Sequence, residues 1–387
     1  MKTKKELIRI PVEDLPKRAL LARLLLDKTQ HLHIARVENV LMVRAFAGNC
    51  ELTMKMPSKG RDFTGIATRA ALTFDVKTRT IPVEVCDLPE AFFECVSQDM
   101  DPVNPERPDL VFEEIGKTRE LKRALKAVLL HEEIDVAQLR GVRFEPDAVV
   151  TVDSAAMIWT PLDVGIKKAF TLPRNAVKML ARLLKVTTEV TVSRAAWSRI
   201  IQFVGPDFVL QVKTLTEHYA NWRSMLLLVG LDEKGIPTDY TERFWVCWET
   251  MIAGAKLKPF LRATADAQPP EELHAQVMLQ HADVKPGTTY ITTKKTKGCT
   301  EIGYARILPT SAKSRGFLLE YLALAVRLFK GGDFELMQFA AVTAFKNQRA
   351  IGPCLLQNAD SPARMILMPC LLDQPPKSKK RAPKIWR

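Results

Sequence analysis

FTLPRNAVKMLARLLK, residues 170–185, is a strongly amphipathic stretch of this sequence. Thr171 can cap a helix that Pro173 opens. The basic residues recur at helical spacing and therefore share one face, which consists of Arg174, Lys178, Arg182 and Lys185. The opposite face is apolar and consists of Val177, Leu180, Ala181 and Leu184. Because the stretch contains no Asp or Glu to balance these cations, we expect an anionic partner outside the helix.

A second helix with the same division of faces is predicted over residues 118–130. Its apolar positions include Leu121, Leu125 and Val128, and its basic positions are Arg119, Lys122, Arg123 and Lys126. A thinner basic set, Lys17, Arg18 and Arg23, accompanies the predicted helix 16–26. In the third predicted domain, residues 231–372, the cations are scattered and include Lys256, Lys258, Arg262, Lys313, Arg315 and Arg327. A single basic face is usually only solvated. Two unbalanced faces favour contacts with nucleic-acid phosphates, which carry little sequence preference and weaken with salt.

The composition is that of a globular protein with a basic surplus. Hydrophobic residues make up 47% of the 387 residues and charged residues 26%, and the net charge of +13 implies a polyanionic partner, first of all nucleic acid. Only six of the 57 basic residues lie in the proline-rich tail 373–387, which we expect to be flexible. The seven cysteines form no CxxC pair, and neither a signal-peptide core nor a bilayer-length apolar run occurs. We therefore expect a cytoplasmic protein.

One local pattern appears three times along the chain: a short β-rich run, a polar break and an amphipathic helix. The copies are 7–12 with 16–26, 110–112 with 118–130, and 244–248 with 249–261. Second helices are predicted at 173–185 and 316–330, whereas their counterpart at 64–77 is only weakly helical. A Pro-rich stretch at 101–108 and a polar segment at 230–241 predict domain boundaries. The expected domains are 1–108, 109–230 and 231–372, each α+β with antiparallel sheet, followed by the basic tail 373–387.

Two short motifs in this order resemble the bacterial DNA sliding clamp, the beta subunit of DNA polymerase III. Residues 170–174 resemble the strand-to-helix entry of the clamp's middle domain, and MILMP at 365–369 resembles its C-terminal strand. The resemblance is fair over 109–230, weaker over 231–372 and faint over 1–108. It implies an α+β chain of three similar clamp-type domains, each with antiparallel sheets and one or two helices. It also implies a head-to-tail homodimeric ring with a helix-lined channel that holds duplex DNA.

The resemblance further implies a partner site, a hydrophobic cleft between the second and third domains that receives short peptides from polymerases and the clamp loader. Carried over by motif, its residues are Asp153, Met157, Ile366, Met368, Pro369 and Leu372. The family's Thr-Asp-Gly-His-Arg-Leu turn is here VDSAAM, residues 152–157, in which Asp153 is the plain match. Alternate residues of 366–368 can equally belong to a buried strand.

The residue patterns of several common enzyme classes are missing from the sequence. It contains no HExxH, no GxxxxGK[ST] and no GxGxxG, and His31 and His33 have no Cys or carboxylate at ligand spacing. We therefore expect a non-enzymatic processivity factor of DNA replication without cofactor or metal. Two alternatives remain. One is a basic DNA-binding scaffold or regulator that closes no ring, and the other is a nucleic-acid enzyme, which metal-dependent turnover would reveal.

Overall fold

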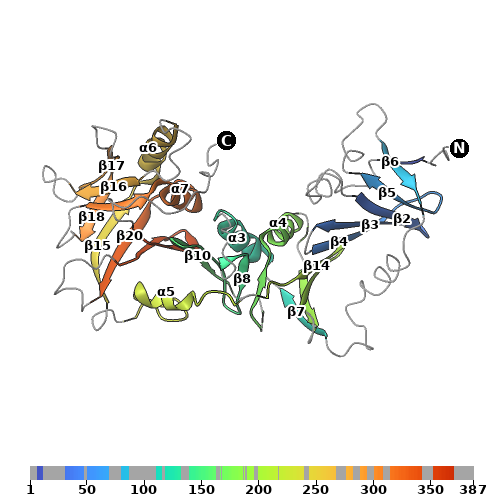
Figure 1. Cartoon of the computed structure of the whole chain (residues 1–387), viewed down its shortest axis with the longest axis horizontal. Coiled ribbons are helices and arrows are strands. Elements are labelled where there is room, and N and C mark those ends of the chain that lie inside the picture. Colours follow the sequence, from blue (N-terminus) through green and yellow to red (C-terminus); the bar gives the residue numbers. More distant parts are fainter. Residues whose placement is uncertain are drawn as a thin grey trace. The chain divides into compact units, whose positions relative to one another are not determined.

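The computed structural model describes most of the chain between residues 7 and 369 (Figure 1). The described residues are 7–11, 31–47, 50–68, 80–86, 110–115, 118–131, 139–162, 166, 168–185, 187, 190–195, 199–216, 218–238, 244–266, 276–281, 288–293, 300–307, 314–341 and 352–369. Three predicted DNA contacts, Lys17, Arg18 and Arg23, lie outside these ranges, as do Leu372 and the basic tail.

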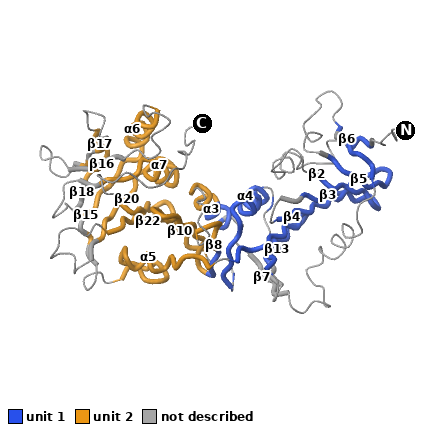
Figure 2. Tube along the Cα trace, viewed as in Figure 1, with its two compact units in different colours: residues 1–125, 144–146, 163–216 blue, residues 126–143, 147–162, 217–387 orange. Residues whose placement is uncertain are grey.

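Contacts within the chain define two compact units (Figure 2). Unit 1 comprises residues 1–125, 144–146 and 163–216, and unit 2 comprises residues 126–143, 147–162 and 217–387. The division into three domains, drawn from the sequence pattern, stays a prediction.

The first sheet lies in unit 1, and its strand pairs are antiparallel. Its order is β1 (Leu7–Pro11), β6 (Thr80–Val85), β5 (Phe63–Thr68), β2 (His31–Val37), β3 (Val40–Ala47), β4 (Cys50–Pro57), β14 (Phe208–Lys213), β13 (Ile200–Gly205), β12 (Val190–Ala195) and β7 (Leu110–Ile115). The β4–β14 pair joins segments more than a hundred residues apart, with Leu52 opposite Leu210. Both of these leucines are fully buried, so this pairing belongs to the core of the unit.

The second sheet joins strands from residues 142–172 with strands from residues 244–367. Its order is β11 (Phe170–Leu172), β8 (Val142–Phe144), β9 (Ala148–Val152), β10 (Ala156–Pro161), β22 (Ser361–Leu367), β21 (Cys354–Asn358), β20 (Phe334–Ala341), β15 (Phe244–Ile252), β18 (Thr300–Ile307), β17 (Thr288–Thr293), β16 (Gln276–His281) and β19 (Ser314–Leu318). Strands β9 and β10 form a hairpin, and β10 pairs with β22 near the end of the described chain. That pairing brings the VDSAAM turn beside the MILMP strand.

The described helices are α3 (Thr118–Val128), α4 (Arg174–Leu183), α5 (Arg223–Leu228), α6 (Gly254–Asp266) and α7 (Leu319–Leu328). Most of the apolar residues of α3 and α4 that recur at helical spacing are buried, as their pattern predicts. In unit 2, α6 and α7 pack against one another (Figure 1). Helix α6 begins at Gly254, where a Cβ would lie 2.4 Å from the carbonyl oxygen of Gly332, a contact that a larger residue could not accept. Among the described helices, none is long and apolar enough to span a membrane.

The antiparallel α+β class is confirmed, but three predicted helices have different bounds. Residues 249–252 continue β15 instead of opening α6, because the buried Thr250 hydroxyl hydrogen-bonds with Thr289 and with the carbonyl of Tyr304. Residues 316–318 belong to β19, which pairs with β16, so α7 begins only at Leu319. The weakly helical stretch 64–77 begins inside strand β5.

Candidate functional site

Helix α4 presents part of the predicted cationic face. Lys178 and Lys185 are exposed and Arg182 is half-buried, so these three side chains lie at or near the surface of unit 1. Arg174 differs from the prediction, because its side chain is only 7% exposed. Long side chains project toward the N-terminus of their helix, and from the first position of α4 that direction leads back over the buried strand end at Leu172.

Helix α3 carries the second predicted face. Arg123 and Lys126 are exposed and Lys122 is half-buried, whereas the side chain of Arg119 lies outside the described part of the structure. Glu120 in the first turn is also exposed, so this face is less uniformly cationic than that of α4. The exposed cations described on these two helices are Arg123, Lys126 and Lys178, with Lys185 just beyond α4.

The cations near the C-terminus have other environments. Arg315 lies in strand β19 instead of a helix, and its side chain is not described. Arg327 is half-buried on α7, where its Nη2 donates a 3.4 Å hydrogen bond to the carbonyl of Leu130. Arg327 therefore makes a contact within unit 2, and its role in DNA binding stays a prediction.

Helix α6 carries two of the scattered cations of the third predicted domain, Lys258 and Arg262, and both are exposed. Their spacing of four residues places them on one side, away from the buried Leu257 and Leu261. That spacing is readable in the sequence, but the helix-breaking potential of Pro259 obscures it. Lys256 lies close to them and pairs with Glu301 at 3.0 Å.

The predicted partner residues separate into buried and accessible members. Met157 and Ile366 face each other across the β10–β22 pair, are 1% exposed, and belong to a core cluster with Trp222 and Leu226 of the α5 region. Met368, just beyond β22, is 37% exposed, and Pro369 is half-buried. The accessible apolar surface near this strand end thus begins at Met368.

Leu227 on α5 was not predicted and is 46% exposed, although its neighbour Leu226 is fully buried in the same cluster as Ile366. A short helix just before a polar linker carries no sequence signal strong enough to identify Leu227. Met368 and Leu227 are thus two exposed apolar side chains whose neighbours in sequence, Leu367 and Leu226, are buried.

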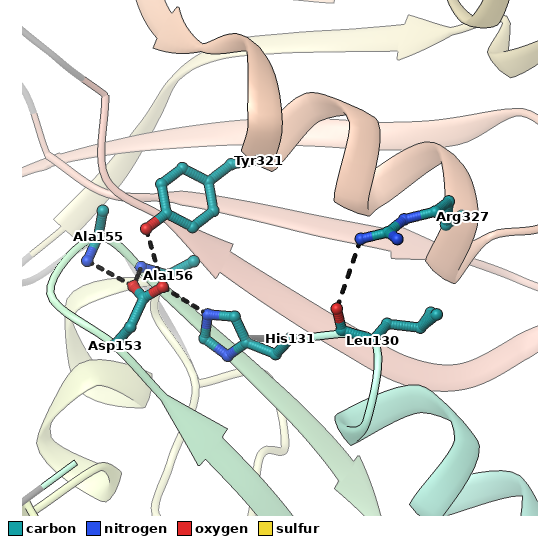
Figure 3. Close-up of polar contacts among 7 residues, drawn as sticks. All are labelled: Leu130, His131, Asp153, Ala155, Ala156, Tyr321 and Arg327. Carbon is teal, nitrogen blue, oxygen red and sulfur yellow. Dashed lines mark hydrogen bonds and ion pairs between the residues drawn. The ribbon is translucent and has the colours of Figure 1, made fainter. Parts of the chain in front are cut away.

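Asp153 does not contribute to an open surface. Its side chain is 5% exposed and lies in the turn between β9 and β10, where Oδ1 accepts hydrogen bonds from the amides of Ala155 and Ala156, both at 2.7 Å. Its Oδ2 lies 2.6 Å from Nε2 of His131 and accepts a 2.8 Å hydrogen bond from the hydroxyl of Tyr321 (Figure 3). We call this cluster of Asp153, His131 and Tyr321 the Asp153 junction.

The electrostatics of the Asp153 junction favour an ionised carboxylate. Burial alone would raise the pKa of Asp153, but the hydrogen bond and charge of His131, the amide of Ala155 and the Tyr321 hydroxyl together hold that pKa below its ordinary value. Burial and the adjacent Asp153 carboxylate raise the pKa of Tyr321, so its phenol stays protonated and donates. Within the described residues, no group of His, Cys, Asp or Glu is arranged to hold a metal ion.

Comparison with solved structures identifies the architecture. The chain has the fold of the bacterial DNA polymerase III beta clamp. A Caulobacter crescentus beta sliding clamp is 13% identical with a TM-score of 0.68, and a DNA polymerase III subunit beta from Pseudomonas aeruginosa is 14% identical with a TM-score of 0.67. A sliding clamp from Bartonella birtlesii is 13% identical with a TM-score of 0.64. Each comparison covers 95% of this chain and 100% of the other.

The likeness is one of structure, because the sequence matches no protein-family model and none of the curated proteins. At 13–14% identity, the overall fold is retained while most side chains differ.

Proposed function

We propose that this chain is a DNA sliding clamp, a non-enzymatic processivity factor that encircles duplex DNA as a homodimeric ring in the cytoplasm. The observation that carries the proposal is the clamp fold over 95% of the chain and the full length of the matched clamps. The extent of the match matters because a likeness to one domain alone would not suggest that the chain can form a clamp ring.

The distribution of charge supports the DNA partner. The net charge of +13 needs an anionic partner, and exposed cations lie on α3 and α6 and on or just beyond α4, namely Arg123, Lys126, Lys178, Lys185, Lys258 and Arg262. Lysine and arginine on helices meet phosphates without reading bases, which suits a protein that slides along DNA.

The partner surface that we propose for a replicative polymerase or clamp loader is centred on Met368 and Pro369, just beyond the buried Ile366. It includes Leu227, whose neighbour Leu226 packs in the same cluster as Met157 and Ile366. An exposed methionine next to a buried apolar cluster suits an apolar peptide side chain, because thioether side chains adapt to irregular partners. Asp153 is excluded from this surface because its carboxylate is buried and fully hydrogen-bonded.

The proposal is tested by DNA synthesis on a primed single-stranded circle with the replicative polymerase and clamp loader of the same cell. We expect the protein to lengthen the products made in a single binding event. Met368→Asp should shorten them again, because a carboxylate would be desolvated against an apolar partner. The matched control is Val40→Asp, a change at an equally exposed position of 37% in unit 1, which should leave product length unchanged. Equal product lengths with and without the wild-type protein would contradict the proposal.

A further inference from the structure

The Asp153 junction brings together three parts of unit 2 that are far apart in the sequence. His131 follows the end of α3, Asp153 lies in the β9–β10 turn, and Tyr321 lies in the first turn of α7 (Figure 3). The rings of His131 and Tyr321 also meet edge to face, with 6.5 Å between their centroids. A buried carboxylate needs compensating hydrogen bonds, so this arrangement is specific to these partners.

The hydrogen-bonding capacity of Asp153 is used within the chain. A carboxylate accepts about four hydrogen bonds. Oδ1 accepts two from backbone amides, and Oδ2 receives one each from His131 and Tyr321. An incoming peptide could bond to Asp153 only by displacing one of these donors.

The turn that Asp153 closes also determines where the accessible end of β22 lies. The carbonyl of Ala155 accepts a 2.8 Å hydrogen bond from the amide of Met368. The adjoining strand register places Ala156 opposite Leu367 and Met157 opposite Ile366. A shift of the turn at residues 153–156 would therefore shift Met368, the exposed apolar residue of the partner surface.

Helix α7 holds the opposite side of the junction at two points. Tyr321 donates to Asp153 near the start of the helix, and Arg327 donates to the carbonyl of Leu130 near its end. Leu130 directly precedes His131, so the helix bonds both to the Asp153 turn and to the segment that carries the histidine. The helix is itself well anchored, because Leu322, Ala323 and Ala325 are fully buried.

We infer that Asp153, His131 and Tyr321 are positioning residues that tie the partner surface at Met368 to helix α7, and that they make no contact with the partner. This inference rests on the proposed function insofar as it treats Met368 as a partner contact. Its physical basis is a series of hydrogen bonds that runs from α7 through the turn to the Met368 amide. Any event that displaces α7 then changes the surface offered to a polymerase or loader.

Amide hydrogen exchange on the full chain tests this series of hydrogen bonds. In Tyr321→Phe, which removes one hydroxyl donor and keeps the ring, we expect exchange of the Ala155, Ala156 and Met368 amides to quicken roughly tenfold. Exchange in the β3–β4 hairpin of unit 1 should stay unchanged. Tyr304→Phe is the matched control, because the Tyr304 side chain is 52% exposed and lies on another strand, β18.

Two substitutions of His131 show whether its hydrogen bond to Asp153, and not only its volume, holds the turn in place. His131→Gln keeps an N–H donor near the position of Nε2. In this variant we expect the Ala155, Ala156 and Met368 amides to exchange at nearly the wild-type rate. His131→Leu removes the donor and should behave like Tyr321→Phe. Unchanged exchange at these three amides in both Tyr321→Phe and His131→Leu would overturn the inference, and so would an equal rise across the whole chain. Ring formation is judged separately by plasmid retention, so the inference and the proposed function can fail independently.

Discussion

At the scale of single residues, Asp153 is a buried carboxylate whose hydrogen-bond donors come from distant parts of the chain. The match to a family turn singles out Asp153, and its place in the β9–β10 turn is as expected. Its role could not be predicted, because the donors that enclose it, His131 and Tyr321, lie 22 and 168 residues away. Arg174 likewise follows the helical period of its neighbours but is buried at the first position of α4.

The lowered pKa of Asp153 predicts a pH-dependent stability. A carboxyl whose pKa is lower in the folded chain stabilises it above the unfolded pKa of about 4, and this stabilisation is lost as pH falls through the folded pKa. Asp153→Asn should lower the free energy of unfolding by about 1–3 kcal/mol at neutral pH. Urea unfolding followed by tryptophan fluorescence should show this difference from the wild type shrinking in acid. Asp266→Asn, at an exposed position, serves as control, and a difference independent of pH would contradict the assignment.

Two glycines, Gly235 and Gly331, have nearly the same positive φ but different surroundings. Gly235 (φ +78°) lies against Trp159, where an added Cβ would be 2.1 Å from Cη2 of the indole, whereas Gly331 (φ +76°) has nothing within 4 Å of that position. Both Ala substitutions carry the same backbone strain, but only Gly235→Ala adds a clash. We expect Gly235→Ala to reduce the free energy of unfolding by about 1–3 kcal/mol more than Gly331→Ala. Equal reductions in urea unfolding would show that Trp159 moves aside freely.

At the scale of helices and strands, hydrophobic periodicity predicts which face of a helix is buried. It predicts poorly the residues at which helices and strands begin or end. Most of the apolar stripe of α4 is buried as predicted, because one side of an amphipathic helix must be covered. The local pattern assigns residues 249–252, the end of β15, and residues 316–318, the end of β19, to helices. Cross-strand partners in β18, β17 and β16 decide both cases, and a local pattern does not contain them.

The exposed cations at α4 give the prediction at this scale. The double variant Lys178→Glu, Lys185→Glu should weaken binding to random-sequence duplex DNA by a similar factor for all sequences. The slope of log affinity against log salt should fall by about 1 for each phosphate that the variant no longer neutralises. Fluorescence anisotropy over a salt series measures both. Lys234→Glu, an exposed lysine of the turn at 231–237, is the control and should bind as the wild type does. An unchanged slope in the double variant would remove α4 from the DNA-contacting surface.

At the scale of the whole chain, pairings between distant strands create the fold. The β4–β14 and β10–β22 pairs join segments separated by more than a hundred residues, and composition or periodicity alone does not specify such partners. The antiparallel α+β class could be predicted from alternating runs and short helices, and the clamp architecture from the two motifs at 170–174 and 365–369. The strand order required the structure, which retains the clamp fold at 13–14% identity.

Retention on a nicked circular plasmid shows whether the chain encircles DNA. The protein is loaded with a clamp loader from the same source and ATP. Gel filtration then follows at a salt concentration that dissociates simple electrostatic complexes. We expect the protein to stay with the circle and to be released when the same plasmid is linearised, because a ring slides off free ends. Equal, salt-sensitive retention on both forms would contradict encirclement and indicate a basic protein that binds the DNA surface.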